Sequence, residues 1–169
     1  MKRNTEELKE KLISVGIEEI RTNGIDRMSM RTIAQKCGVT HGAPYKHFGS
    51  KDRYIQVVME HLSMFFLTNM IQGILELVKQ EMGIEFDEES LHYERFVTHL
   101  KFLAQRLYRH ELLKDEEIEF ARMMENKYPK EYECSKHIAE YIEKEYGSGI
   151  ASEEIMFLAI HIKRVCMAG

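Results

Sequence analysis

The sequence predicts an all-α protein made of a three-helix head and a five-helix body. Only two of the 169 residues are proline, and residues that favour helices, such as Glu, Lys, Leu, Ile and Met, are abundant. Apolar residues recur every three or four positions along most of the chain, which is the period of an amphipathic helix. A composition of 44% hydrophobic and 31% charged residues is that of a folded soluble protein. We expect two small domains, 1–66 and 67–169.

Capping residues mark the ends of the helices expected in the head. The first helix ends at Asn23, which with the following glycine forms a pair suited to a left-handed cap. Ser29 can cap a short second helix, and Thr40 can cap a third that ends near Phe48. Ser50 can cap a much longer helix that runs into the seventies, so the join between the two domains lies inside a continuous helical pattern.

The body is expected to contain the end of this long helix and four further helices. They are predicted over 91–108, 115–128, 129–146 and 152–166. Pro129 can begin its helix, since the first turn tolerates proline, and Gly147 can end it. Ser152 opens the last helix, and the two glutamates that follow suit the positive end of the helix dipole. These elements would form a regulatory and dimerisation bundle.

Charge is unevenly distributed between the two parts. The net charge is −4, but residues 1–60 carry 11 Lys and Arg against 8 Asp and Glu, whereas residues 61–169 carry 13 against 20. The stretch from Arg27 to Arg53 has six basic residues and one acidic residue. A basic head on an acidic body suits a protein that contacts nucleic acid at one end only.

The stretch GVTHGAPYKHFGSKD, residues 38–52, places glycine and proline inside a short predicted helix. Two short helices joined by a turn that contains glycine form a helix-turn-helix, whose second helix enters the major groove of DNA. If Thr40 caps that helix, Pro44 falls in its first turn, where backbone N–H groups lack helical partners and proline costs little. Gly42 and Ala43 keep the helix thin, so its backbone can approach base edges.

The segment SMRTIAQKCGVTHGAPYKHFGSKDRYIQVVMEHL resembles the DNA-binding head of TetR-family transcriptional repressors, over about residues 5–65. This resemblance implies that five residues face DNA bases: Arg31, Thr40, His41, Gly42 and Ala43. Contacts to DNA phosphates are expected from four side chains that can donate hydrogen bonds: Tyr45, Lys46, His47 and Lys51. Phe48 would pack in the core of the head, and Pro44 replaces a more usual aliphatic residue.

The segments ESLHYERFVTHLKFLAQRLYRHE and KYPKEYECSKHIAEYIEKEYGSGIASEEIMFLAIHIKRV resemble the two ends of a PRD module. That module is the phosphotransferase-system regulation domain of bacterial sugar-operon antiterminators and activators, and the similarity covers about residues 70–167. It implies a dimerising bundle in which two histidines, His99 and His161, accept phosphoryl groups from phosphocarrier proteins. Arg106 and Arg164 lie in the same motifs. Such modules commonly occur in tandem behind another kind of head, so this combination is either a natural exchange of modules or an engineered fusion.

From the residues alone, both histidines have a second interpretation. His99 stands beside Phe96 and His161 beside Phe157 at helical spacing, and a single histidine on an apolar helix face is more often a packed core or interface residue. A neutral imidazole is nevertheless a good phosphoryl acceptor near neutral pH. The histidines outside the motif cores are expected on the surface: His92, His110 and His137.

Other classes of function find no support in the sequence. No nucleophile stands beside a base in a recognisable motif and no glycine-rich phosphate loop is present, so we expect no enzyme. Apart from Cys134 and His137 at i and i+3, no residues have metal-ligand spacing, so we expect neither metal nor cofactor. Dispersed cysteines, no signal-peptide pattern and no apolar run near the ~18 residues of a membrane span predict a cytoplasmic protein without a membrane partner.

The sequence therefore predicts a bacterial transcription regulator, a homodimer that binds a pseudo-palindromic operator in double-stranded DNA. Its input would be phosphorylation of the body by phosphocarrier proteins of the sugar phosphotransferase system. An alternative is a repressor released from DNA by a small apolar ligand that binds between helices of the body. Another is a phosphorelay or protein-interaction module whose head binds no operator.

Overall fold

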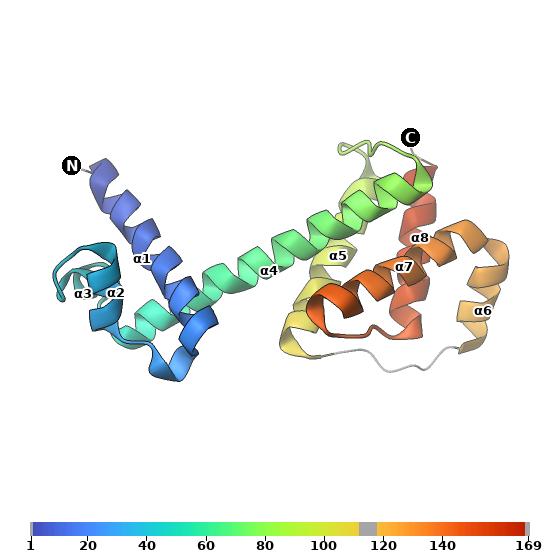
Figure 1. The fold of residues 1–169 in the computed structure, drawn as a ribbon. Helices are drawn as coiled ribbons and strands as arrows, with labels where there is room; N and C mark the ends of the chain where they lie inside the picture. Colours follow the sequence, from blue (N-terminus) through green and yellow to red (C-terminus); the bar gives the residue numbers. More distant parts are fainter. Residues whose placement is uncertain (1, 112–117, 168–169) are drawn as a thin grey trace. The chain divides into compact units, whose positions relative to one another are not determined.

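The computed structural model describes residues 2–111 and 118–167, and every regular element within these ranges is helical (Figure 1). The elements are α1 (Lys2–Asn23), the 3₁₀ turn η1 (Ile25–Arg27), α2 (Met30–Cys37), α3 (Ala43–Phe48), α4 (Lys51–Met82), α5 (Leu91–Arg109), α6 (Ile118–Lys127), α7 (Pro129–Tyr146) and α8 (Ser152–Cys166). The chain divides into two compact units, Met1–Phe65 and Phe66–Gly169, called the head and the body below. The predicted all-α class, with three helices followed by five, is confirmed.

Several helix ends follow from local capping chemistry, as expected, although the side chain of Ser29 makes no capping hydrogen bond and the N-cap of α8 is Ala151. Gly38 adopts a left-handed conformation, φ 73°, and closes α2 after its buried face. The hydroxyl of Ser50 accepts a hydrogen bond from the Arg53 amide at 3.1 Å, which caps α4. The bounds predicted for α7 and α8 agree with the structure. The helix predicted over 115–128 begins in a segment outside the described residues, and α6 is described from Ile118.

The start of α3 differs from the prediction. Thr40 does not cap this helix, because its carbonyl accepts a hydrogen bond from the Ala43 amide at 2.9 Å in a separate turn. Gly42 is the N-cap instead, and α3 begins two residues later than a Thr40 cap would place it. Pro44 still lies in the first turn, as predicted, where its missing N–H costs no helical hydrogen bond.

The core of the head is built from α1, α2, α3 and the start of α4. Its members are almost fully buried apolar side chains, among them Leu12, Ile33, Phe48, Tyr54 and Val58. The Tyr54 hydroxyl donates a 2.7 Å hydrogen bond to the Leu12 carbonyl, and the Phe48 ring meets the Tyr54 ring edge-on at 5.0 Å. These contacts hold α3, through its last residue, against α1 and α4.

The core of the body joins the end of α4 to α5, α7 and α8. Each helix contributes a fully buried apolar stripe: Met70, Ile74 and Val78 from α4; Phe96, Leu100, Leu103 and Leu107 from α5; Ile138 and Ile142 from α7; Leu158, Ile162 and Val165 from α8. Helices α5 and α8 pack together in this core, and α7 also packs on α8. The two histidine-bearing helices are therefore neighbours in space.

Helix α4 bears on the expectation that the chain has no segment resembling a membrane span. By length and composition it could cross a membrane, since an 18-residue window within it has a mean hydropathy of 1.2. A single helix of this kind is weak evidence, because a core helix of a soluble protein passes the same test. Val58 of α4 is buried in the core of the head, and Met70 and Ile74 are buried in that of the body.

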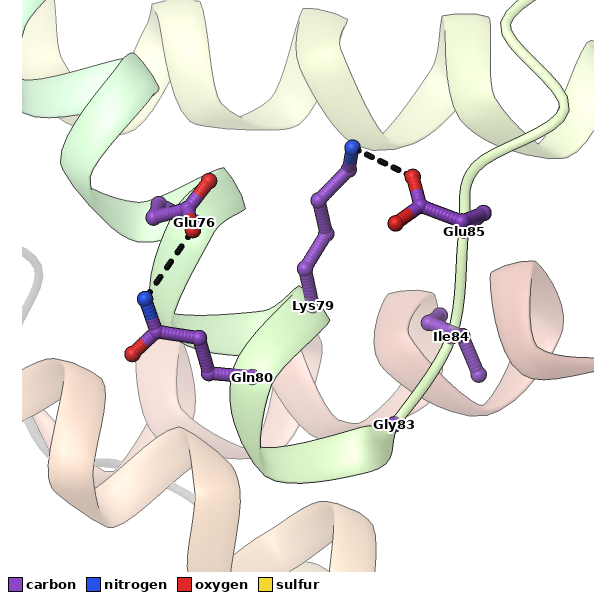
Figure 2. A pocket seen from close by; sticks show the side chains of 6 residues that line it. All are labelled: Glu76, Lys79, Gln80, Gly83, Ile84 and Glu85. Atoms are coloured by element: carbon purple, nitrogen blue, oxygen red, sulfur yellow. Dashed lines mark hydrogen bonds and ion pairs between the residues drawn. The ribbon is translucent and has the colours of Figure 1, made fainter.

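A shallow hollow of about 390 Å³ lies where α4 ends (Figure 2). Gly83 turns the chain with φ 64°, a left-handed conformation that glycine adopts without strain. Lys79 reaches across the hollow to Glu85 at 2.7 Å, and Gln80 donates to Glu76 at 2.9 Å (Figure 2). Its lining residues contribute no histidine, so the hollow is distinct from the site developed below.

Candidate functional site

The residues predicted to face DNA bases lie on α2 and in the turn before α3. Arg31 is exposed on α2, and Thr40, His41 and Gly42 are exposed in the turn. Ala43, the first residue of α3, is half-buried. A side chain added at Gly42 would meet no atom within 4 Å, so its backbone is open on that side. The local surface is therefore available, as a backbone approach to base edges would require.

The residues predicted to hold phosphates lie on α3 and at the first residue of α4. Tyr45, Lys46 and Lys51 are exposed and His47 is half-buried, whereas Pro44 is buried and Phe48 lies in the core. The rings of His41 and Tyr45 lie 5.7 Å apart, so one side chain from the turn and one from the helix support each other. Pro44, which was expected to replace a more usual aliphatic residue, is thus buried.

His99 on α5 and His161 on α8 are brought together although 62 residues separate them. Their rings stack with centroids 4.8 Å apart and an angle of 26° between the planes. Each histidine also lies near a phenylalanine ring. The ring centroids of Phe96 and His161 are 6.1 Å apart, and those of Phe157 and His99 are 6.2 Å apart. The resemblance that selected both histidines therefore selected one joint site within the body.

Glu154 of α8 is a member of this site that the sequence interpretation missed. Its side chain is 2% exposed, and one carboxylate oxygen, Oε1, accepts from the Arg106 Nε at 2.9 Å and also from the Arg106 Nη2. The other oxygen, Oε2, lies 3.7 Å from the His99 Nε2. Glu154 was noted only as an acidic residue at a helix start, yet it stands seven residues before His161, as Arg106 stands seven after His99.

Burial keeps both rings neutral at physiological pH. Desolvation, with His161 and Arg106 nearby, lowers the pKa of His99 to about 4. Desolvation, with Arg164 and Arg95 nearby, also lowers the pKa of His161. A neutral imidazole has a free lone pair on one nitrogen, so each ring can act as a nucleophile at pH 7.

A surface pocket of about 440 Å³ opens beside the histidine pair. It is lined by Leu91, Glu94, Arg95, Thr98, His99, Phe102 and His161. Leu91 and Phe102 are 55% and 57% exposed, so the mouth of the pocket is apolar, with the Arg95 cation beside it. The half-buried pair is thus reached from solvent beside one cation, Arg95, and one anion, Glu94.

The remaining histidines of the body serve other contacts. His137 joins α7 to α4 through a 2.7 Å contact between its Nδ1 and a carboxylate oxygen of Glu81, and this contact, with the charges of nearby glutamates, raises its pKa. His92, expected on the surface, is half-buried, and its Nδ1 is buried without a hydrogen-bond partner. His110 is exposed and ends α5 in a left-handed conformation. Within 2–111 and 118–167, no group of three or more His, Cys, Asp or Glu could hold a metal ion.

The fold and site define a class: a helix-turn-helix head joined to a helical module that stacks two histidines. Two family models match the chain, that of the PRD domain over residues 72–165 and that of bacterial regulatory proteins of the tetR family over residues 12–53. The chain therefore belongs to the PRD domain family, and its head is of the tetR type.

Curated relatives agree with the match to the body. The chain is 48% identical over 99 residues to the transcription antiterminator LicT of Bacillus subtilis, across 59% of this chain and 36% of that protein. It is 39% identical over 99 residues to the beta-glucoside operon antiterminator of Dickeya chrysanthemi, covering 59% and 35%, and 34% identical over 106 residues to the protein GlcT of Staphylococcus aureus, covering 61% and 37%. The chain thus aligns with little more than a third of the length of these relatives.

Proposed function

We propose that this protein regulates transcription by binding double-stranded DNA through its head, under the control of histidine phosphorylation in its body. The stacked pair of His99 and His161 is the observation that carries the proposal. Two neutral imidazoles beside a pocket, with Arg95 at its edge, suit acceptance of a dianionic phosphoryl group. The membership of the body in the PRD domain family supports the same reading.

The head supports binding to DNA. Its exposed residues from Arg31 to Lys51 carry the chemistry that base and phosphate contacts need, and the tetR-family match covers this helix-turn-helix. As a homodimer the protein would present two copies of α3 about one DNA turn apart, ~34 Å, to a pseudo-palindromic operator. Two of the three named relatives are antiterminators, but the head here matches a family model of its own, so we propose DNA as its target.

Phosphoryl transfer to the purified protein tests this function. The protein is incubated with phosphoenolpyruvate and the general proteins of the sugar phosphotransferase system, and acid-labile phosphohistidine is mapped by mass spectrometry. We expect label on His99 or His161 and none after both are changed to alanine. His110→Ala, which removes an exposed histidine outside the site, is the matched control and should keep the label. A folded wild-type protein that takes no label overturns the phosphorylation mechanism.

A second candidate input is a small apolar ligand in the pocket beside the histidines. The exposed apolar side chains of Leu91 and Phe102 at its mouth favour it. In that case operator binding should still respond to the ligand in the double His99→Ala/His161→Ala protein, with an altered affinity because both histidines line the pocket. Loss of the response in Leu91→Ser/Phe102→Ser, with DNA binding retained, would assign the input to the pocket.

A further inference from the structure

Two buried polar atoms face each other in the body without a hydrogen bond. The His99 Nε2 and the Glu154 Oε2 lie 3.7 Å apart, and neither has a hydrogen-bond partner. Buried polar groups are normally paired, because leaving one unpaired costs its full desolvation energy. Each atom is therefore the natural partner of the other, since a small rotation of either side chain closes the gap to a hydrogen bond.

Arg106 decides which of the two atoms is the donor. Its Nε and Nη2 both donate to Oε1 of Glu154, so Oε2 is the oxygen left for His99. Burial raises the pKa of Glu154, but the Arg106 guanidinium, which is always charged and only donates, lowers it and favours the ionised carboxylate. An ionised carboxylate only accepts hydrogen bonds, so the proton between the two residues must belong to the imidazole.

We propose that Glu154 is a positioning residue that holds the proton of His99 on Nε2 and so directs an incoming phosphoryl group to Nδ1. In a neutral imidazole one nitrogen carries the proton and the other the lone pair, and the partner of the first fixes the position of the second. The inference deepens the function proposed above and rests on it for the phosphoryl step. The position of the proton on the His99 Nε2 does not depend on phosphorylation.

The second ring has the opposite arrangement. The buried nitrogen without a partner is Nδ1 in His161, whereas it is Nε2 in His99. A nitrogen that solvent cannot touch cannot meet a phosphoryl donor in line. Each ring therefore accepts through its other nitrogen, which is Nε2 in His161 and Nδ1 in His99, so the two histidines give different phosphohistidine isomers.

The transfer balances without loss of a proton from the site. The Nδ1 lone pair of His99 attacks phosphorus on a phosphorylated carrier protein, the N–P bond forms, and the bond from phosphorus to the carrier breaks, returning its electron pair to the carrier. The His99 ring keeps its Nε2 proton and becomes positively charged. Glu154 stabilises that charge, as a buried carboxylate stabilises the imidazolium that forms in a hydrolase triad.

Glu154→Gln is the informative variant, because it keeps the shape of the side chain. Arg106 can only donate, so the amide oxygen should remain on Arg106 and the amide NH₂ should turn towards His99. The Nε2 of His99 must then accept, and its proton moves to Nδ1. The variant thus reverses the tautomer with little change in packing, while Glu153→Gln, the neighbouring carboxylate on α8, serves as control.

Nitrogen NMR of the unphosphorylated ¹⁵N-labelled protein reports the tautomer directly. We expect a protonated, pyrrole-like Nε2 and an unprotonated, pyridine-like Nδ1 for His99, assigned by loss of its signals in His99→Gln. Glu154→Gln should exchange the two shifts, and Glu153→Gln should leave them in place. A wild-type His99 with its proton on Nδ1, or a Glu154→Gln protein with unchanged shifts, overturns the inference.

The isomer of the phosphorylated ring gives an independent readout. With phosphorylated carrier protein, and with phosphoramidate as a small donor, the wild type should carry the phosphoryl group on Nδ1 of His99 and on Nε2 of His161. In Glu154→Gln, labelling of His99 should fall about tenfold or more, the scale of a lost hydrogen bond to a charged group, while His161 labels as before. Label on Nε2 of His99 in the wild type overturns the inference. No label from the carrier, with the expected tautomer seen by NMR, refutes the proposed function and leaves the role of Glu154 standing.

Discussion

Arg106 and Glu154, 48 residues apart in sequence, join α5 to α8 through a single carboxylate oxygen. Since that carboxylate is 2% exposed, removal of its cation leaves a buried charge without a partner. Loss of one partner of a buried ion pair costs about 3–5 kcal/mol, and the 26% exposure of Arg106 places Arg106→Ala at the lower end, about 3 kcal/mol. Urea unfolding of the variant measures this loss.

The double variant Arg106→Met/Glu154→Met is the control for that prediction. It removes both charges and keeps most of the buried volume, so it should recover much of the stability that Arg106→Ala loses. The double-mutant cycle isolates the coupling between the two residues. A single variant within about 0.5 kcal/mol of wild type would show that the pair carries no such energy.

The depressed pKa of His99 predicts a loss of stability in mild acid. The ring titrates near 6.5 in the unfolded chain and near 4 in the folded protein, so between these values the unfolded state binds more protons. The contribution of His99 is fully present above about pH 6.5 and is lost as the pH falls towards 4, by up to about 3 kcal/mol.

Comparison with His99→Gln isolates this effect from the titration of other groups. Glutamine does not titrate, so the free energy of unfolding of the variant should fall less steeply from pH 7 to pH 4.5 than that of the wild type. Denaturant unfolding at several pH values measures both curves. Parallel curves would mean that His99 has an ordinary pKa.

Gly16 of α1 lies directly against Tyr54, so the head has no room for a larger residue there. A Cβ added at Gly16 would clash with the Tyr54 hydroxyl oxygen and lie 2.9 Å from its Cζ and from the Val58 Cγ2. We expect Gly16→Ala to destabilise the head by about 1–3 kcal/mol, because Tyr54 must move and loosen its bond to the Leu12 carbonyl. Thermal unfolding followed by circular dichroism measures this loss.

Gly42→Ala is the control for Gly16→Ala, because it adds the same methyl group at an open position of the head. Its added Cβ meets no atom within 4 Å, and its φ of −78° suits alanine. We therefore expect little change in stability, together with weaker DNA binding if the backbone of Gly42 approaches the bases. Equal melting temperatures for the Gly16→Ala and wild-type proteins would contradict the close contact between α1 and α4.

Lys51 and Arg31 should have different effects on DNA binding. A phosphate contact from Lys51 is independent of sequence, so Lys51→Ala should weaken binding to all DNA and reduce the slope of log K against log salt by about 1. A base contact from Arg31 should instead cost about 1–3 kcal/mol at the operator and relax base preference. Lys144→Ala, which removes a cation of the body that is 83% exposed, is the control. An unchanged slope in Lys51→Ala would remove Lys51 from the interface.

The sequence predicted the helices well because their ends depend on nearby residues. The hydroxyl of Ser50, the left-handed Gly38 and the proline that opens α7 act within a few positions of the backbone groups that they satisfy. The predicted start of α3 was wrong for a similarly local reason. A turn and a helix cap compete for the same residues there, and the hydrogen bond from the Ala43 amide to the Thr40 carbonyl forms the turn.

The site was predicted only in part, because its key relationship is tertiary. Motif resemblance selected His99 and His161, and spacing places Arg106 on the face of α5 that carries His99, two turns away. Spacing also places Glu154 two turns before His161 on α8. Only the packing of α5 on α8 shows how the two helices meet in the site. The carboxylate of Glu154 on α8 contacts both His99 and Arg106 of α5.

Helix α4 supplies residues to two separate cores, which gives its middle an unusual status. Leu62 packs against the core of the head and Phe66 against that of the body, so Ser63, Met64 and Phe65 belong to neither. Met64 and Phe65 are 62% and 68% exposed, and short helical stretches without tertiary support are marginally stable in water. We therefore expect α4 to be least stable at these three residues, between two segments that are each held by a core of their own.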